Sequence, residues 1–159
     1  MRLKTLLAAL ALGLAACSPA TSDAASGAAK AARHPVSGLA VIPLTVTHAG
    51  KVHTFRVEVA RSRDEQMRGL MFRTEMGGDE GMIFPMEPPR MASFWMKNTV
   101  MPLDIVFIGR DRRIVNIAAN TVPYSLDGVE SADLVSAVLE LNAGRAAALG
   151  IAPGDRVRW

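Results

Sequence analysis

The run from Leu103 to Ile108 is apolar at every position except Asp104. A strand of this composition has no face to offer to water, so it belongs inside a sheet that is covered on both sides. Gly109-Arg110-Asp111-Arg112 then turns the chain, and Ile114 to Ile117 returns it as the second strand of a hairpin. The chain must therefore build apolar layers on both faces of a sheet.

Further strands are predicted before and after this hairpin. Leu39 to Thr47 and Val52 to Ala60 alternate apolar and polar residues around a turn that contains Gly50, which predicts a β-hairpin. Val135 to Leu141 and Arg156 to Trp159 repeat the strand pattern, the second as a short piece after the turn Pro153-Gly154-Asp155.

The segment between residues 81 and 96 is expected to hold two short strands. Gly81 to Phe84 reads as a brief strand that Pro85 ends, and Met91 to Met96 reads as the next one. Glu87-Pro88-Pro89-Arg90 is not expected inside a central strand, because proline removes a donor from the hydrogen-bond ladder. Residues 120–132 are expected to form a polar loop.

Two short helices complete the prediction. Ser62 and Glu65 have the spacing of a capping box, and Gly69 predicts either an early end of that helix or a close backbone approach. Asn142 is expected to cap a second helix over Ala143 to Leu149, which Gly150 ends. The fold class is therefore α+β and mostly β, one compact domain of about seven short strands, a partly closed barrel, with two short helices.

The first sixteen residues are expected to be a secretory signal peptide. Arg2 and Lys4 precede an apolar stretch, Thr5 to Leu14, that is too short to span a bilayer. Leu14-Ala15-Ala16-Cys17 resembles the bacterial lipobox, and the chain has only 1 cysteine. We therefore expect lipid on Cys17, a flexible Ala/Ser-rich tether over residues 17–38 and a globular domain over 39–159.

The N-terminal features and the charge limit the location and the partners that we expect. Ser18 follows the cysteine, where aspartate commonly marks inner-membrane retention, so the expected location is the periplasmic face of the outer membrane. Without Arg2 and Lys4 the net charge falls from +3 to about +1, and no basic cluster with interleaved aromatics indicates nucleic-acid binding. A monomer without a cofactor or metal, attached to the membrane through its lipid, is expected.

Several short motifs together resemble the family of unknown function DUF192. They are Arg68-Gly69-Leu70-Met71-Phe72-Arg73, Glu80-Gly81-Met82-Ile83-Phe84, Phe94-Trp95-Met96-Lys97-Asn98-Thr99, Pro102-Leu103-Asp104-Ile105, Leu139-Glu140-Leu141 with Gly144, and Gly150 with Gly154-Asp155. The resemblance covers roughly Val57 to Val157 and implies a small β-rich domain, often secreted or membrane-anchored. It implies no reaction.

The densest group of usable side chains lies in Phe94 to Ile105. If this segment is a binding site, Trp95 would stack on a small polar ligand, a glycan or an envelope partner, and Lys97, Asn98 and Asp104 would bind the polar groups of that ligand or partner. As a structural motif, Asn98 and Asp104 would instead satisfy backbone groups in a tight connection. Both interpretations stay open here. Arg68, Glu80 and Glu140 complete the candidate set, and no catalytic residue is assigned.

Two other functions are weighed. Eight of the 9 methionines lie between Met67 and Met101 and could bind Cu(I), although Met67, Met71, Met82 and Met96 are also expected to fill a core. An envelope glycan hydrolase would need two carboxylates in one cleft, drawn from Glu80, Asp104 and Glu140.

Overall fold

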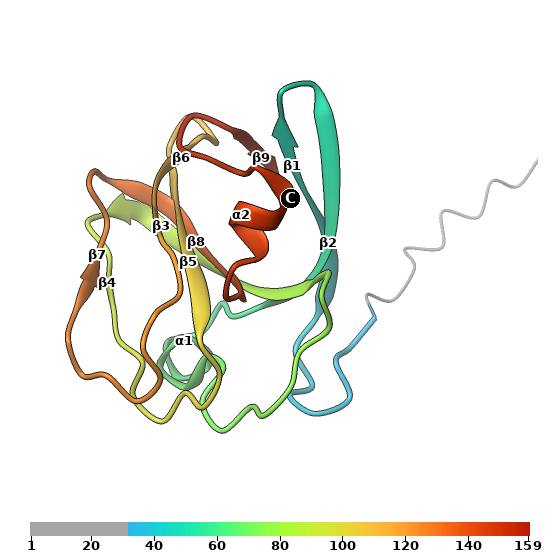
Figure 1. Cartoon of the computed structure of the whole chain (residues 1–159). Coiled ribbons are helices and arrows are strands. Elements are labelled where there is room, and N and C mark those ends of the chain that lie inside the picture. The colour runs from blue at the N-terminus through green and yellow to red at the C-terminus, as the bar shows by residue number, and fades with distance from the viewer. Residues whose placement is uncertain (1–31) are drawn as a thin grey trace, which may run out of the picture.

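Seven strands form one sheet in the computed structural model, which describes residues 32–159 (Figure 1). The order across the sheet is β6-β5-β8-β3-β2-β1-β9, and a separate ribbon pairs β4 with β7. Only β2 and β3 run parallel. The strands are β1 (Val41–His48), β2 (Lys51–Val59), β3 (Glu80–Arg90), β4 (Ser93–Phe94), β5 (Leu103–Gly109), β6 (Ile114–Ala118), β7 (Val129–Glu130), β8 (Val135–Asn142) and β9 (Arg156–Arg158).

The two helices are α1 (Arg63–Arg68) and α2 (Arg145–Leu149). The prediction of a mostly β domain with two short helices is confirmed. The sheet is not closed into a barrel: β6 and β9 remain its outer strands. Its edges meet at one point, where Arg113 and Arg156 form an isolated bridge and the Ile114 amide donates to the Asp155 carbonyl over 2.9 Å.

The central strands are covered on both faces. Every residue of β5 is buried, as its composition predicts. We call the face that carries Val106 and Leu139 the inner face; α2 lies against it, within the curl of the sheet (Figure 1). The other, or outer, face carries Met82 and Ile105 and is covered by α1 and the β4–β7 ribbon.

Most of the local predictions are confirmed. β1 and β2 form the expected hairpin, and the capping box of α1 is complete, with Ser62 and Glu65 each accepting from the other's backbone amide. Gly69 ends α1 with a φ of 46°, and a Cβ there would lie 3.4 Å from the ring of Phe84. Both consequences expected of this glycine, an early helix end and a close approach, are present.

The prediction that Pro85 ends a strand is wrong. β3 continues to Arg90, although its register against β8 shifts between Pro85 and Arg90. β2 pairs with β3 only as far as Ile83, so the missing amide of Pro85 lies where β3 has a neighbour on one side alone.

Two further predictions need correction. The strand expected over Met91 to Met96 is reduced to β4, because the chain turns at Lys97 and Asn98. Its partner β7 lies inside the segment 120–132, which was expected to be an irregular loop.

The segment before β1 is held against the domain. Arg33 and Ala40 form a bridge, and the His34 amide donates to the Leu39 carbonyl over 2.9 Å, so these last residues of the expected tether form a turn. The predicted signal peptide and Cys17 lie outside the described residues. Within residues 32–159 no helix has the length and apolar character needed to cross a membrane.

Candidate functional site

A cavity of about 250 Å³ opens on the outer face between α1, β3 and the segment from Arg90 to Trp95. Its walls combine four thioether and three aromatic side chains with seven polar or charged ones. The lining residues are Arg63, Gln66, Met67, Arg68, Gly69, Leu70, Met71, Phe84, Met86, Arg90, Met91, Ala92, Ser93, Phe94, Trp95, Thr99 and Glu140. Small-molecule sites likewise combine apolar walls with polar groups that orient the ligand.

Glu140 is the only carboxylate in this lining. It lies on β8 between Ile105 of β5 and Met82 of β3, and its exposed fraction is 5%. Burial among these apolar neighbours raises the pKa of Glu140 to about 8, and no other cause contributes to the shift. Near neutral pH the group is therefore mostly an uncharged carboxylic acid that can donate one hydrogen bond.

A second buried glutamate on the same face shows what Glu140 lacks. Glu58 of β2 lies beside Met82, on the side opposite Glu140. Its two oxygens accept from the two terminal nitrogens of Arg73 over 3.0 and 3.2 Å, and the Ser37 hydroxyl also donates to it. Among residues 32–159, Glu140 has no comparable partner. A buried carboxyl left free at the floor of a cavity is available to a ligand.

The two sides of the cavity are fixed by specific contacts. The Gln66 side-chain amide donates to the carbonyls of Ala60 and Pro85 over 3.2 and 2.8 Å, which ties α1 to the residue that follows β2 and to the middle of β3. On the other side, the ring of Phe94 packs edge to face on Phe84 and Phe107, with centroids 5.1 and 6.4 Å apart. These contacts hold both sides of the cavity in place, so the cavity is a fixed feature of the fold.

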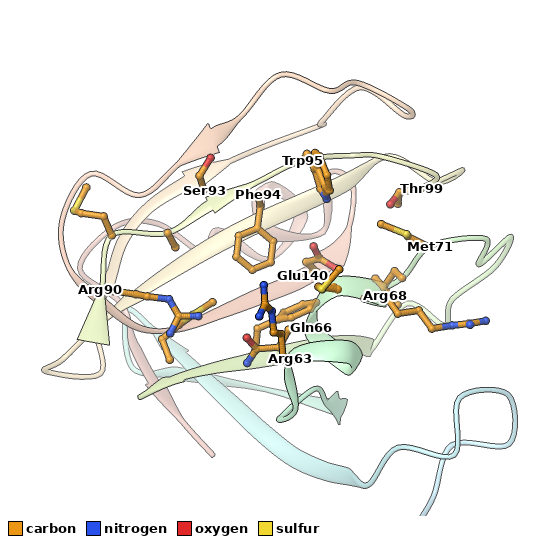
Figure 2. Close-up of a pocket in the computed structure, with 17 residues that line it drawn as sticks. Arg63, Gln66, Arg68, Met71, Arg90, Ser93, Phe94, Trp95, Thr99 and Glu140 are labelled. Atoms are coloured by element: carbon orange, nitrogen blue, oxygen red, sulfur yellow. The ribbon is translucent and has the colours of Figure 1, made fainter. Parts of the chain in front are cut away.

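Cationic groups surround the entrance. Figure 2 shows the side chains of Arg63 and Arg90 reaching toward the cavity from different elements, while Arg68 extends away from it. With Glu140 mostly uncharged, the lining carries only positive charge. Such a site favours a ligand with an anionic group.

Three of the predicted site residues come together here. Trp95, Arg68 and Glu140, which lie far apart in the sequence, all line the cavity. Lys97 and Asn98 do not line it. The Lys97 ammonium lies 5.0 Å from the centroid of the Trp95 ring, and Asn98 occupies a turn at a φ of 54°, with its carbonyl accepting from the Phe72 amide over 2.8 Å.

Asp104 lies on the inner face, where its carboxylate accepts hydrogen bonds from three backbone amides. One of its oxygens accepts from the amides of Asn120 and Gly144, both over 3.0 Å, and the other accepts from the Ala146 amide over 2.9 Å. Asp104, not the expected Asn142, thus satisfies the amides at the start of α2, whose N-cap is Gly144. The side-chain amide of Asn142 donates instead to the carbonyls of Met76 and Gly77. None of these contacts of Asp104 involves Lys97 or Asn98, with which the binding-site interpretation grouped it.

The three candidate carboxylates do not share one cleft. Asp104 pairs with Leu141 and therefore points to the face opposite Glu140. Glu80 accepts from the Gly77 amide over 3.0 Å and lines a different cavity. Within residues 32–159, no three histidine, cysteine or acidic side chains gather closely enough to hold a metal ion.

Sequence reasoning missed Glu58, Arg63 and Arg90. Glu58 lies between the apolar residues Val57 and Val59, and the alternation alone does not reveal that the outer face of β2 is covered at this end of the strand. Arg63 and Arg90 reach one cavity from different elements, and no spacing along the chain reveals that.

Comparison with known proteins confirms the family resemblance predicted from the sequence motifs. The model of a family described as "Uncharacterized ACR", DUF192, matches residues 44–159. The chain belongs to this family. No curated protein matches it.

Two solved structures share the fold of this DUF192 domain. One is a crystal structure of a protein of unknown function from Novosphingobium aromaticivorans DSM 12444: it is 59% identical, with a TM-score of 0.80, and the match covers 83% of this chain and 94% of that one. The other, from Sinorhizobium meliloti 1021, is named as a candidate transcription regulator: it is 40% identical, with a TM-score of 0.74, and the match covers 76% and 94%. The matched part makes up nearly the whole of the first relative's chain, so in that relative a chain of this extent is folded.

Replacing Asp104 tests its structural role. We expect Asp104→Asn to lower the free energy of unfolding by about 2–3 kcal/mol, because an amide cannot accept at both ends from the three backbone donors. Lys97→Ala should change it by less than about 0.5 kcal/mol, since this side chain is exposed. Urea unfolding measures both. Equal effects would contradict the assignment.

Replacing Glu140 tests the raised pKa. Between its ordinary value of 4.5 and about 8, the folded protein keeps a proton that the unfolded chain has lost. The wild-type free energy of unfolding should therefore contain a component that falls as pH rises across this window, by up to roughly 1 kcal/mol per pH unit. The Glu140→Gln variant lacks this component. Its free energy of unfolding should therefore rise relative to that of the wild type as pH increases to about 8, and the difference should stay constant above that pH. A stability difference that is independent of pH in urea unfolding would refute the raised pKa.

Proposed function

We propose that the DUF192 domain binds a small amphipathic anion in the Glu140 cavity. The observation that carries this proposal is the buried carboxyl of Glu140, which has no hydrogen-bond or ion-pair partner among residues 32–159 and lies at the floor of a cavity with both apolar and polar walls. An apolar cavity of about 150 Å³ can hold benzene, so about 250 Å³ has room for a ring with a short substituent.

The chemistry of the lining supports three features in the ligand. Phe84, Phe94 and Met86 favour an apolar body. The uncharged Glu140 favours a hydrogen-bond acceptor such as a carbonyl oxygen. Arg63 and Arg90 favour a carboxylate or similar anion at the entrance. A glycan, the ligand first considered, matches these walls less well, because three of the polar side chains are arginines and the side-chain amide of Gln66 already donates to two backbone carbonyls.

Matched probes test each feature on residues 32–159. Benzoylpropionate carries a ring, a carbonyl and a carboxylate; phenylbutyrate lacks the carbonyl; phenylbutanol lacks both the carbonyl and the charge. We expect benzoylpropionate to bind best in isothermal titration calorimetry, with a roughly threefold to tenfold loss for phenylbutyrate and a further loss of roughly tenfold for phenylbutanol.

Variants assign these losses to residues. In Glu140→Leu the preference for benzoylpropionate over phenylbutyrate should vanish. Arg63→Gln and Arg90→Gln should weaken both anions but not phenylbutanol. Arg61→Gln is the matched control, because Arg61 is a neighbouring arginine that does not line the cavity. Absence of binding by all three probes at millimolar concentration, or an unchanged preference in Glu140→Leu, would overturn the proposal.

Cu(I) binding stays a second candidate because four methionines, Met67, Met71, Met86 and Met91, line the same cavity. Met67 and Met91 are more than half exposed, at 62% and 54%, and so are free to reorient toward a metal. Anaerobic titration against a Cu(I) chelator separates the two functions. Uptake of one equivalent that is lost in a Met71→Leu/Met86→Leu variant would favour copper.

A further inference from the structure

Met67 is the most exposed methionine in the described part of the chain. Its side chain is 62% exposed, and among the eight methionines of residues 32–159 only Met91, at 54%, is also mostly exposed. Met82 and Met96, by contrast, are buried in the core of the outer face. A small oxidant in the solvent can therefore reach the Met67 sulfur, whereas the buried thioethers are protected.

Met67 also lies beside a cationic group of the Glu140 cavity. Arg63 and Met67 are four residues apart on α1, so their side chains are neighbours on one side of the helix, and both line the cavity, toward which Arg63 reaches (Figure 2). Within residues 32–159 the Arg63 side chain has no hydrogen bond or ion pair. Of the acids next to it, Glu65 accepts from two backbone amides that precede the helix, and Asp64 lines a different cavity. Arg63 is thus available to a strong acceptor that forms at Met67.

Oxidation supplies Met67 with such an acceptor. Hydrogen peroxide transfers one oxygen atom to the sulfur: the S–O bond forms as the O–O bond breaks, the sulfur loses an electron pair, and the peroxide that gains this pair leaves as water. The sulfoxide oxygen accepts hydrogen bonds, and a guanidinium has five N–H donors. A sulfoxide at Met67 can therefore bind the neighbouring Arg63.

We propose that Met67 is a site of reversible oxidation that controls anion binding in the Glu140 cavity. While Met67 is a thioether, Arg63 can bind the carboxylate of the ligand. Once Met67 is a sulfoxide, Arg63 binds the sulfoxide oxygen, and the ligand loses one of the two arginines that favour it at the entrance. Methionine sulfoxide reductases restore the thioether, which makes the change reversible. This inference rests on the ligand proposed above.

Peroxide treatment of the Met91→Leu variant of residues 32–159 tests the inference, because Met67 is then the only mostly exposed methionine in this part of the chain. Peptide mass spectrometry should detect oxygen on Met67 well before Met82 and Met96. In isothermal titration calorimetry the oxidised protein should bind benzoylpropionate more weakly by roughly threefold or more. Treatment with a methionine sulfoxide reductase should restore the affinity. Phenylbutanol, which carries no charge, should bind both forms equally.

Two further variants assign the loss to the pair of residues. Met67→Leu/Met91→Leu is the matched control, and its affinity for benzoylpropionate should be the same before and after peroxide treatment. In Arg63→Gln/Met91→Leu the loss on oxidation should also disappear, because the guanidinium that binds the sulfoxide has been removed.

The possible failures of this experiment are distinguishable. If benzoylpropionate binds equally well after Met67 is oxidised, the inference is overturned and the proposed ligand stands. An equal loss in Met67→Leu/Met91→Leu, or an equal loss for phenylbutanol, would show general damage to the cavity and would also overturn it. Oxidation of Met82 or Met96 ahead of Met67 would do the same. Absence of benzoylpropionate binding before oxidation would overturn the proposed function, and this inference with it.

Discussion

The central strands β3, β8 and β5 are covered by apolar layers on both faces, and the rest of the molecule depends on this constraint. A polar side chain in the buried middle of these strands cannot reach bulk water, so it must find a partner or lose its charge. Three carboxylates are buried in the sheet, Glu58, Asp104 and Glu140, and each meets the constraint differently. Asp104 accepts from three backbone amides, and Glu58 pairs with Arg73.

Glu140 meets the constraint by keeping its proton. The sheet places Met82 and Ile105 beside it, and the nearest arginines surround the cavity entrance without pairing with it. A chain that satisfies its other two buried carboxylates so fully has left this one open toward a cavity. We therefore propose Glu140 as the binding group, and we regard Asp104, one of the candidate binding residues, as the residue that anchors α2 to the sheet.

Much of the fold follows from the sequence because it depends on local patterns. The apolar run from Leu103 to Ile108 predicts a doubly buried strand, and Ser62 with Glu65 predicts the start of α1. β3 was misjudged at Pro85, because the sequence does not reveal that β2 stops pairing before that residue. Asp104 and Glu140 were both recognised as candidates, but their roles depend on which face of the sheet each occupies. That follows from the pairing of β5 with β8, which links positions far apart in the chain.

Burial of the Glu140 carboxyl at the cavity should keep it uncharged near neutral pH. Carbon-13 NMR of the glutamate carboxyl groups in residues 32–159 measures this directly, with Glu140→Gln assigning the resonance. The account predicts that the Glu140 carboxyl titrates with a midpoint near 8 in the free protein. A midpoint near the ordinary value of 4.5 would show a charged, hydrated carboxylate at this position and would contradict the account.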